Sequence, residues 1–82
     1  MVVAYVLIST EIGAEGRVLD RLQEFPEIEE AYIIYGIYDI LVKINLKDES
    51  KLRETVTKIR RIEGVKSTLT IQVVRGFTRK AA

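Results

Sequence analysis

The first strand-like segment of this chain is apolar on both of its faces. Residues 2–9 (VVAYVLIS) are β-branched or apolar, with no regular alternation to polar residues. Successive side chains of a β-strand point to opposite faces of its sheet. Whichever set faces the core, the opposite set is therefore apolar as well, and we expect both faces of this strand to be covered. A chain of 82 residues has little material with which to cover them.

The spacing of apolar residues predicts five further elements. Val18 and Leu22 lie on one helical stripe, and Pro26 ends that helix because a residue before proline disfavours the α conformation. Asp48 is a candidate N-cap of a second helix, and Gly64 is expected to end it in the left-handed conformation. The predicted elements are strand 2–9, helix 14–24, strands 28–35 and 38–46, a helix between Asp48 and Gly64, and strand 65–74.

The order of these elements is β-α-β-β-α-β. The short connection at Gly36 and Ile37 predicts an antiparallel hairpin in which Gly36 supplies a positive φ. We therefore predict an α+β fold of the ferredoxin-like type, a four-stranded antiparallel sheet with two helices on one face and the first and third strands central. The 82 residues are expected to form one domain, with residues from about 76 to 82 loosely ordered.

Two helices cover one face of such a sheet and leave the other open. An apolar open face on a small domain marks an interface, and the simplest partner is a second copy related by a twofold axis. The sequence leaves open which set of side chains in each strand faces the helices. The candidate interface residues are Val3, Tyr5, Leu7, Ala31 and Ile33.

The residue types present give little support for catalysis. The chain has no cysteine and no histidine, and we predict no enzyme, no cofactor and no metal site. We expect Glu27, Glu29 and Glu30 to form a solvated edge. The net charge of +1 argues against direct nucleic-acid binding, and the basic cluster of Arg75, Arg79 and Lys80 is interpreted as a solvated tail. The absence of a long apolar run and of cysteine favours a cytoplasmic protein.

Two motifs carry a resemblance to a known family. Residues 36–42 read GIYDILV, in the predicted hairpin and the strand that follows it. Residues 62–70 read IEGVKSTLT, across the end of the second helix and the start of the last strand. In this order and spacing the chain resembles, over essentially its whole length, the RAM domain. This is the effector-binding domain of the leucine-responsive regulatory protein/AsnC family of transcription regulators.

The resemblance implies a cytoplasmic homodimer formed by packing of two sheets, with dimers joined into a closed ring of the octamer type. It also implies an amino-acid effector bound between dimers, near the turn at Gly36. The helix-turn-helix domain of these regulators does not precede the first strand, so the chain resembles a stand-alone RAM protein. Contact with DNA would then require a partner, such as a full-length regulator of the same family.

Carried over to this sequence, the family's pocket has two parts. Gly36 would let backbone groups approach the ligand, and Asp39 would meet an ammonium group or orient the hairpin. A plain hairpin glycine and a purely structural aspartate are the alternatives. Tyr35 and Ile37 stand where the family often has a small hydroxyl residue and a polar residue. The predicted ligand-binding residues are Tyr35, Gly36, Ile37, Tyr38, Asp39, Thr68 and Thr70.

These observations lead to an expected function with three alternatives. We expect an oligomeric module that binds an amino-acid effector and is linked to transcription regulation without its own DNA-binding domain. The first alternative is a ligand-independent assembly partner of a full-length regulator. The others are an ACT-type amino-acid-binding domain and an enzyme of the dimeric α/β-barrel class.

Overall fold

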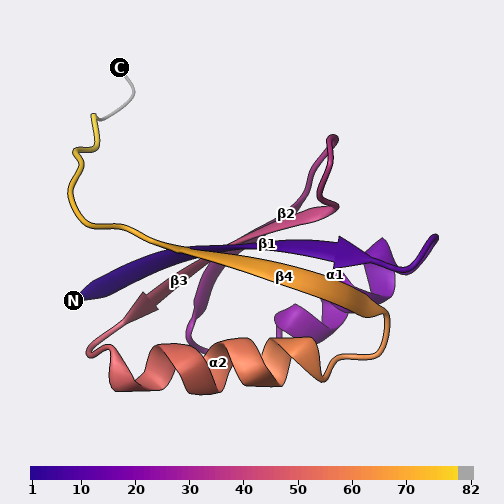
Figure 1. The fold of residues 1–82 in the computed structure, drawn as a ribbon, viewed down its shortest axis with the longest axis horizontal. Helices are drawn as coiled ribbons and strands as arrows, with labels where there is room; N and C mark the ends of the chain where they lie inside the picture. Colours follow the sequence, from indigo (N-terminus) through magenta and orange to yellow (C-terminus); the bar gives the residue numbers. More distant parts are fainter. Residues whose placement is uncertain (80–82) are drawn as a thin grey trace.

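A computed structural model describes residues 1–79 of the chain. Four antiparallel strands form one sheet in the order β2-β3-β1-β4, and both helices lie against the same face of it (Figure 1). This confirms the predicted fold, with β1 and β3 central. The elements are β1 (Val2–Thr10), α1 (Glu15–Leu22), β2 (Ile28–Ile33), β3 (Ile40–Leu46), α2 (Ser50–Arg60) and β4 (Val65–Gln72).

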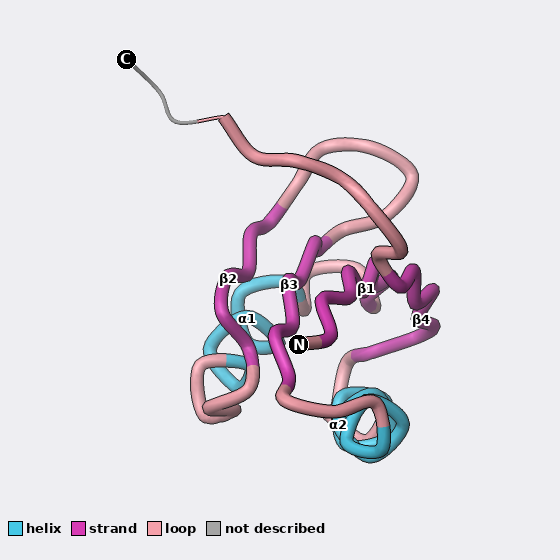
Figure 2. The backbone as a smooth tube through the Cα atoms, turned by 90° about the vertical axis from the view of Figure 1, so that its left-hand side faces the viewer, coloured by secondary structure: helices cyan, strands magenta, loops and turns pink. Residues whose placement is uncertain are grey.

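The even-numbered side chains of the two central strands form the core. They pack against the apolar stripes of α1 and α2, and they are buried because the helices cover that face. The odd-numbered side chains of β1, which include Val3, Tyr5 and Leu7, therefore point to the face without helices, which is the upper face in Figure 2. We call this the open face. The core list includes Val6, Ile8, Val18, Leu22, Ile40, Val42, Ile44 and Ile59.

The ends of α2 follow local rules of helix termination. Its first residue is Ser50, whose backbone N–H and hydroxyl both donate to the Asp48 carboxylate, the former over 2.9 Å. These bonds stabilise the charged carboxylate and lower the pKa of Asp48. After the helix, Gly64 has a φ of +103°, as predicted for the residue that reverses the chain. The Glu49 side chain makes no capping bond and instead accepts one from Gln72 of β4 over 2.8 Å.

The connection between β2 and β3 is longer than the sequence suggested. The strands end at Ile33 and restart at Ile40, and the N–H of Ile34 donates to the carbonyl of Asp39 over 2.9 Å. The reversal is spread over residues 35–38, so no residue needs a left-handed conformation. The positive φ predicted for Gly36 is therefore wrong: among residues 1–79 only Gly13 and Gly64 have one.

The C-terminal part of the chain continues beyond β4 as an extended segment up to Arg79 (Figure 1). Lys80, which belonged to the predicted basic cluster, lies outside the described residues, as does the end of the tail predicted for 76–82. Within the described part of the chain, neither helix has the length and apolar character needed to cross a membrane.

Candidate functional site

The open face carries an apolar row that crosses all four strands. The strand register places Leu7 of β1 opposite Leu41 of β3 on one side and Leu69 of β4 on the other, and Leu41 lies opposite Tyr32 of β2. Leu69 is 45% exposed. Contiguous apolar surface of this kind is typical of an interface. The row is extended along the central and edge strands by Val3, Tyr5, Ile71 and Val73.

Two of the predicted interface residues do not lie on this face. The register between β2 and β3 shifts between Ile28 and Glu30, so that Ala31 is opposite Val42 and Ile33 is opposite Ile40. Both partners belong to the buried core. Ala31 and Ile33 therefore lie on the helix side, and their predicted place on the face of Val3, Tyr5 and Leu7 was wrong. One extra residue in a strand moves every later side chain of that strand to the other face of the sheet.

A second irregularity moves the start of β4. The register between β1 and β4 shifts between Ser9 and Thr10, so that Val65 lies opposite Thr10. Val65 therefore packs against the core, whereas regular alternation along the strand would place it on the same face as Ser67 and Leu69.

The outer edge of the open face is charged. The Lys43 ammonium lies 3.3 Å from a Glu29 carboxylate oxygen and 3.7 Å from one of Glu30. The Tyr32 hydroxyl donates to Glu30 over 2.6 Å. This bond and the nearby negative charge raise the pKa of Tyr32, and the Glu29 carboxylate raises the pKa of Lys43.

Glu27, the third acid of the predicted edge, turns toward the helices instead. It accepts a hydrogen bond of 3.1 Å from Thr55 of α2. Within residues 1–79 no group of three potential ligands is placed to hold a metal ion. The edge formed by Glu29, Glu30 and Lys43 is thus a charged border of the open face.

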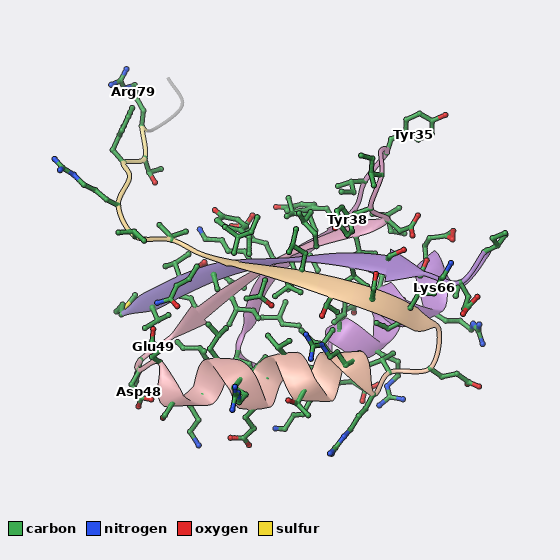
Figure 3. The ribbon with its side chains drawn as sticks, viewed as in Figure 1. Tyr35, Tyr38, Asp48, Glu49, Lys66 and Arg79 are labelled. Atoms are coloured by element: carbon green, nitrogen blue, oxygen red, sulfur yellow. The ribbon has the colours of Figure 1, made fainter. Side chains whose placement is uncertain are left out.

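The β2–β3 hairpin stands away from the sheet on the side opposite the helices. Figure 3 shows Tyr35 at its tip, directed away from the body, and Tyr38 near its base. Tyr35 and Ile37 are almost completely exposed to solvent. Large apolar side chains at the tip of a projecting loop are suited to contact with another molecule.

Asp39 fixes the base of this hairpin to the end of β1. Its Oδ2 accepts a hydrogen bond of 2.8 Å from the backbone N–H of Thr10, and its own N–H donates to the carbonyl of Ile8 over 2.9 Å. The carboxylate thus occupies the structural role that was the alternative to ligand contact. These two bonds connect the base of the hairpin to the end of β1.

We expect Asp39→Ala to loosen the hairpin and to lower the free energy of unfolding by about 1–3 kcal/mol, because the partly buried N–H of Thr10 loses its acceptor. Asp39→Asn, which keeps an oxygen acceptor, is expected to lose less. Urea unfolding and amide exchange at Thr10 measure both effects. Asp20→Ala, on the exposed side of α1, is the matched control. If Asp39→Ala and Asp20→Ala lowered the free energy of unfolding by the same amount, the role given to Asp39 would be contradicted.

Thr68 and Thr70 do not lie with the hairpin in one pocket of the protomer. They point to the helix side of β4, where the Thr68 hydroxyl accepts a bond of 2.9 Å from Nε of Arg60. Thr70 lines a groove of about 540 Å³ between β4 and α2, together with Arg53 and Arg60. Any site that joins these threonines to the hairpin requires a second copy, and their ligand role stays a prediction.

Sequence reasoning did not find this groove. Its only local signal is the spacing of Arg53 and Arg60, two turns apart on one helix. Arg53 and Glu49 are spaced for an i, i+4 ion pair, but among the described residues the Glu49 carboxylate accepts a hydrogen bond from Gln72 instead.

The fold defines a ferredoxin-like α+β domain with an apolar open face, and similarity to known proteins identifies its family. The family model for the Lrp/AsnC ligand-binding domain matches residues 3–81. The chain belongs to this family, and what it matches is the ligand-binding domain.

Among curated relatives, the HTH-type transcriptional regulator FL11 of Pyrococcus furiosus is 35% identical over 74 residues, which cover 90% of this chain and 49% of the regulator. The chain thus spans about half the length of the curated regulators that it matches. Among solved structures, FFRP-DM1 is 36% identical with a TM-score of 0.86, covering 90% of this chain and 100% of its own. A protein of Thermus thermophilus is 32% identical with a TM-score of 0.89, covering 96% and 100%.

Two other similarities bear on function. The homocitrate synthase of Sulfurisphaera tokodaii is 44% identical over 55 residues, which cover 67% of this chain and 12% of the enzyme. A Neisseria meningitidis transcriptional regulator solved as a complex with L-Met has a TM-score of 0.83, covering 95% of this chain and 53% of its own. At 15% identity this second likeness shows the fold alone.

Proposed function

We propose that this protein is an oligomeric module that binds a free amino acid and passes that signal to a regulator of transcription. The observation that carries the proposal is an apolar open face flanked by a projecting hairpin, in a chain whose whole length matches a ligand-binding domain. An amino acid is proposed as the effector class because the family model describes a ligand-binding domain and a regulator of the same fold was solved with L-Met. The proposal places the module in the cytoplasm, where regulators and free amino acids meet.

The proposed assembly uses the two surfaces differently. Two copies pair through their open faces, because the apolar row in the centre of each sheet otherwise remains in water. The hairpins then project from the dimer, where Tyr35 and Ile37 are available for contacts between dimers in a ring of the octamer type. We place the effector at these contacts, against Gly36 and Tyr38 of the hairpin.

A melting screen of the twenty amino acids, run with measurement of mass in solution, tests this proposal. A ligand present at 100 times its Kd stabilises the folded state by about 2.7 kcal/mol, which corresponds to a rise in Tm of about 10–20 °C for a domain of this size. The apolar tip leads us to expect the largest shifts with apolar amino acids.

The variant Ile37→Lys is expected to remove both the shift and the ring while leaving the dimer intact. Ile12→Lys, at an equally exposed apolar position in the β1–α1 loop, is the control. If no amino acid moves the Tm or the mass at millimolar concentration, the sensing role fails. A ligand-independent assembly partner of a full-length regulator then becomes the better description.

The similarity to homocitrate synthase favours a second candidate, namely control of a biosynthetic enzyme in place of a regulator. The same module would then report the level of an amino acid to an enzyme that leads to its synthesis. Co-elution of the purified chain with an Lrp/AsnC regulator, or with such a synthase, from the same organism separates the two. Each complex should respond to the amino acid found in the melting screen.

A further inference from the structure

The groove between α2 and β4 lies on the helix side of the sheet, whereas the open face and the hairpin lie on the other side. The two elements run side by side in both ribbon views (Figures 1 and 2). We call the space of about 540 Å³ between them the α2–β4 groove. All of its lining residues belong to one protomer, and the effector site proposed above does not include it.

The strand wall of this groove is polar where the neighbouring strand is apolar. Directly opposite residues of paired strands point to the same face of a sheet. If β4 only packed against a helix, apolar residues would be expected at its helix-facing positions. Instead α2 does not close onto β4, and three polar residues of β4 lie opposite three buried core residues of β1: Thr68 opposite Ile8, Thr70 opposite Val6 and Gln72 opposite Ala4.

Two hydrogen bonds between side chains join α2 to β4, one toward each end of the groove. Nε of Arg60 donates to the Thr68 hydroxyl over 2.9 Å, and Nε2 of Gln72 donates to the Glu49 carboxylate over 2.8 Å. Four residues of strand separate these two bonds, a span of about 13 Å. Because Arg60 is held through Nε, the terminal nitrogens of its guanidinium remain as donors of fixed direction.

The groove has an excess of positive charge. Arg53 and Arg60 form no ion pair within residues 1–79, and Glu54, which follows Arg53 in the chain, is shared by Lys51 and Lys58. Two guanidiniums and the single carboxylate of Glu49 give the lining a net charge of +1. The arginines lie two turns apart on one face of α2, about 10 Å along its axis, which two arginine side chains can span toward a common ligand.

We propose that the α2–β4 groove binds a small carboxylic acid that has no amino group. The ligand's carboxylate lies between the guanidiniums of Arg53 and Arg60 and neutralises the lining, and its carbon chain lies on Leu52 and Val56. An inorganic anion would leave that apolar surface unused. An α-amino acid would bring its ammonium group close to two guanidiniums, which repel it.

This site gives the module a second ligand, of a class different from the proposed effector. The effector is placed at contacts between dimers, against the hairpin, whereas the groove is complete within one copy. The module therefore has separate sites for an amino acid and for an acid without an amino group. The two proposals stand or fall independently.

Isothermal titration of the full chain with four small molecules tests the class of ligand. Hexanoate has both the charge and the carbon chain. Norleucine adds an α-ammonium group, hexanamide lacks the charge, and acetate lacks the chain. We expect hexanoate to saturate one site per protomer, and the other three to bind this site at least about tenfold more weakly. If acetate bound as tightly as hexanoate, the groove would attract anions without selecting a ligand, and the proposal would be wrong.

The same titrations with Ile37→Lys separate the groove from the hairpin site. Norleucine that binds the unmodified chain but not Ile37→Lys belongs to the hairpin. Hexanoate should bind both proteins equally, because Ile37 is on the opposite side of the sheet from the groove. Loss of hexanoate binding in Ile37→Lys would place this ligand at the hairpin and overturn the proposal, as would norleucine binding to Ile37→Lys as tightly as hexanoate.

Replacement of the arginines tests the residues of the site. We expect Arg53→Gln and Arg60→Gln each to raise the Kd for hexanoate by about 10- to 100-fold, because each removes charged donors to the carboxylate. Arg17→Gln, at an exposed arginine of α1 outside the groove, is the matched control and should leave the Kd unchanged. An unchanged Kd in both groove variants, or no binding of hexanoate to the unmodified chain, would overturn the proposal and leave the amino-acid screen unaffected.

Discussion

Leu7→Glu is expected to convert the protein from a dimer to a monomer. Leu7 lies in the middle of the open face, between Leu41 and Leu69 on the neighbouring strands. In a single copy Leu7 is partly buried, and a longer glutamate side chain at this position can still extend its carboxylate to water at a smaller cost. Between two paired sheets it is buried without a partner, which costs about 3–5 kcal/mol and therefore raises the dimer Kd more than about a hundredfold.

Light scattering over a range of protein concentrations measures this change. The control is Ile12→Glu, which places the same charge at a fully exposed apolar position away from the open face. A small domain that loses its partner also loses stability, so we expect Leu7→Glu to melt at a lower temperature that no longer depends on protein concentration. An unchanged mass for Leu7→Glu would refute pairing through this face.

Gly64→Ala is expected to lower the free energy of unfolding by about 2–4 kcal/mol, through backbone strain and crowding together. The φ of +103° at Gly64 is unfavourable for any residue with a Cβ. An added Cβ would also lie 3.0 Å from Cβ of Ala14 and 3.2 Å from Cγ2 of Val18, both of them buried, so the neighbours have little freedom to move. The strain falls where α2 ends against the start of α1.

Gly13→Ala is the matched control. Gly13 also has a positive φ, of +81°, but an added Cβ would meet no atom within 4 Å. The substitution there has the conformational cost alone, partly offset by the reduced freedom of the unfolded chain. At about 4–8 °C per kcal/mol, thermal unfolding should place Gly64→Ala clearly below Gly13→Ala. Equal melting temperatures for Gly64→Ala and Gly13→Ala would show that the close contacts at Gly64 are relieved by movement of the helices.

Much of the fold could be predicted because its signals are local. The apolar stripe of α1 and the left-handed residue at Gly64 each depend on a few neighbouring residues, and the structure has them where the sequence predicted them. The helix that was expected to run to residue 24, before Pro26, ends slightly earlier, at Leu22. The turn at Gly36 could not be predicted in the same way. The Ile34 N–H pairs with the Asp39 carbonyl, which leaves the four residues 35–38 for the reversal, and none of them has a positive φ.

The candidate site was predicted less completely than the fold. Sequence motifs drew attention to the hairpin and to Thr68 and Thr70, but only the strand order shows that these two groups lie apart within one copy. The role of Asp39 as an acceptor for Thr10 joins residues far apart in the sequence. No pattern of neighbouring residues contains that information.

The sequence by itself determined that the sheet has two apolar faces, because β1 shows no alternation on which a solvent-facing side could be built. Only the tertiary structure decided which residues form the open face. That choice depends on two register irregularities, at Glu30 and at Thr10, each of which exchanges the two faces for all later residues of a strand. For the same reason Tyr32 lies on the open face, whereas Ala31 and Ile33 lie on the helix side.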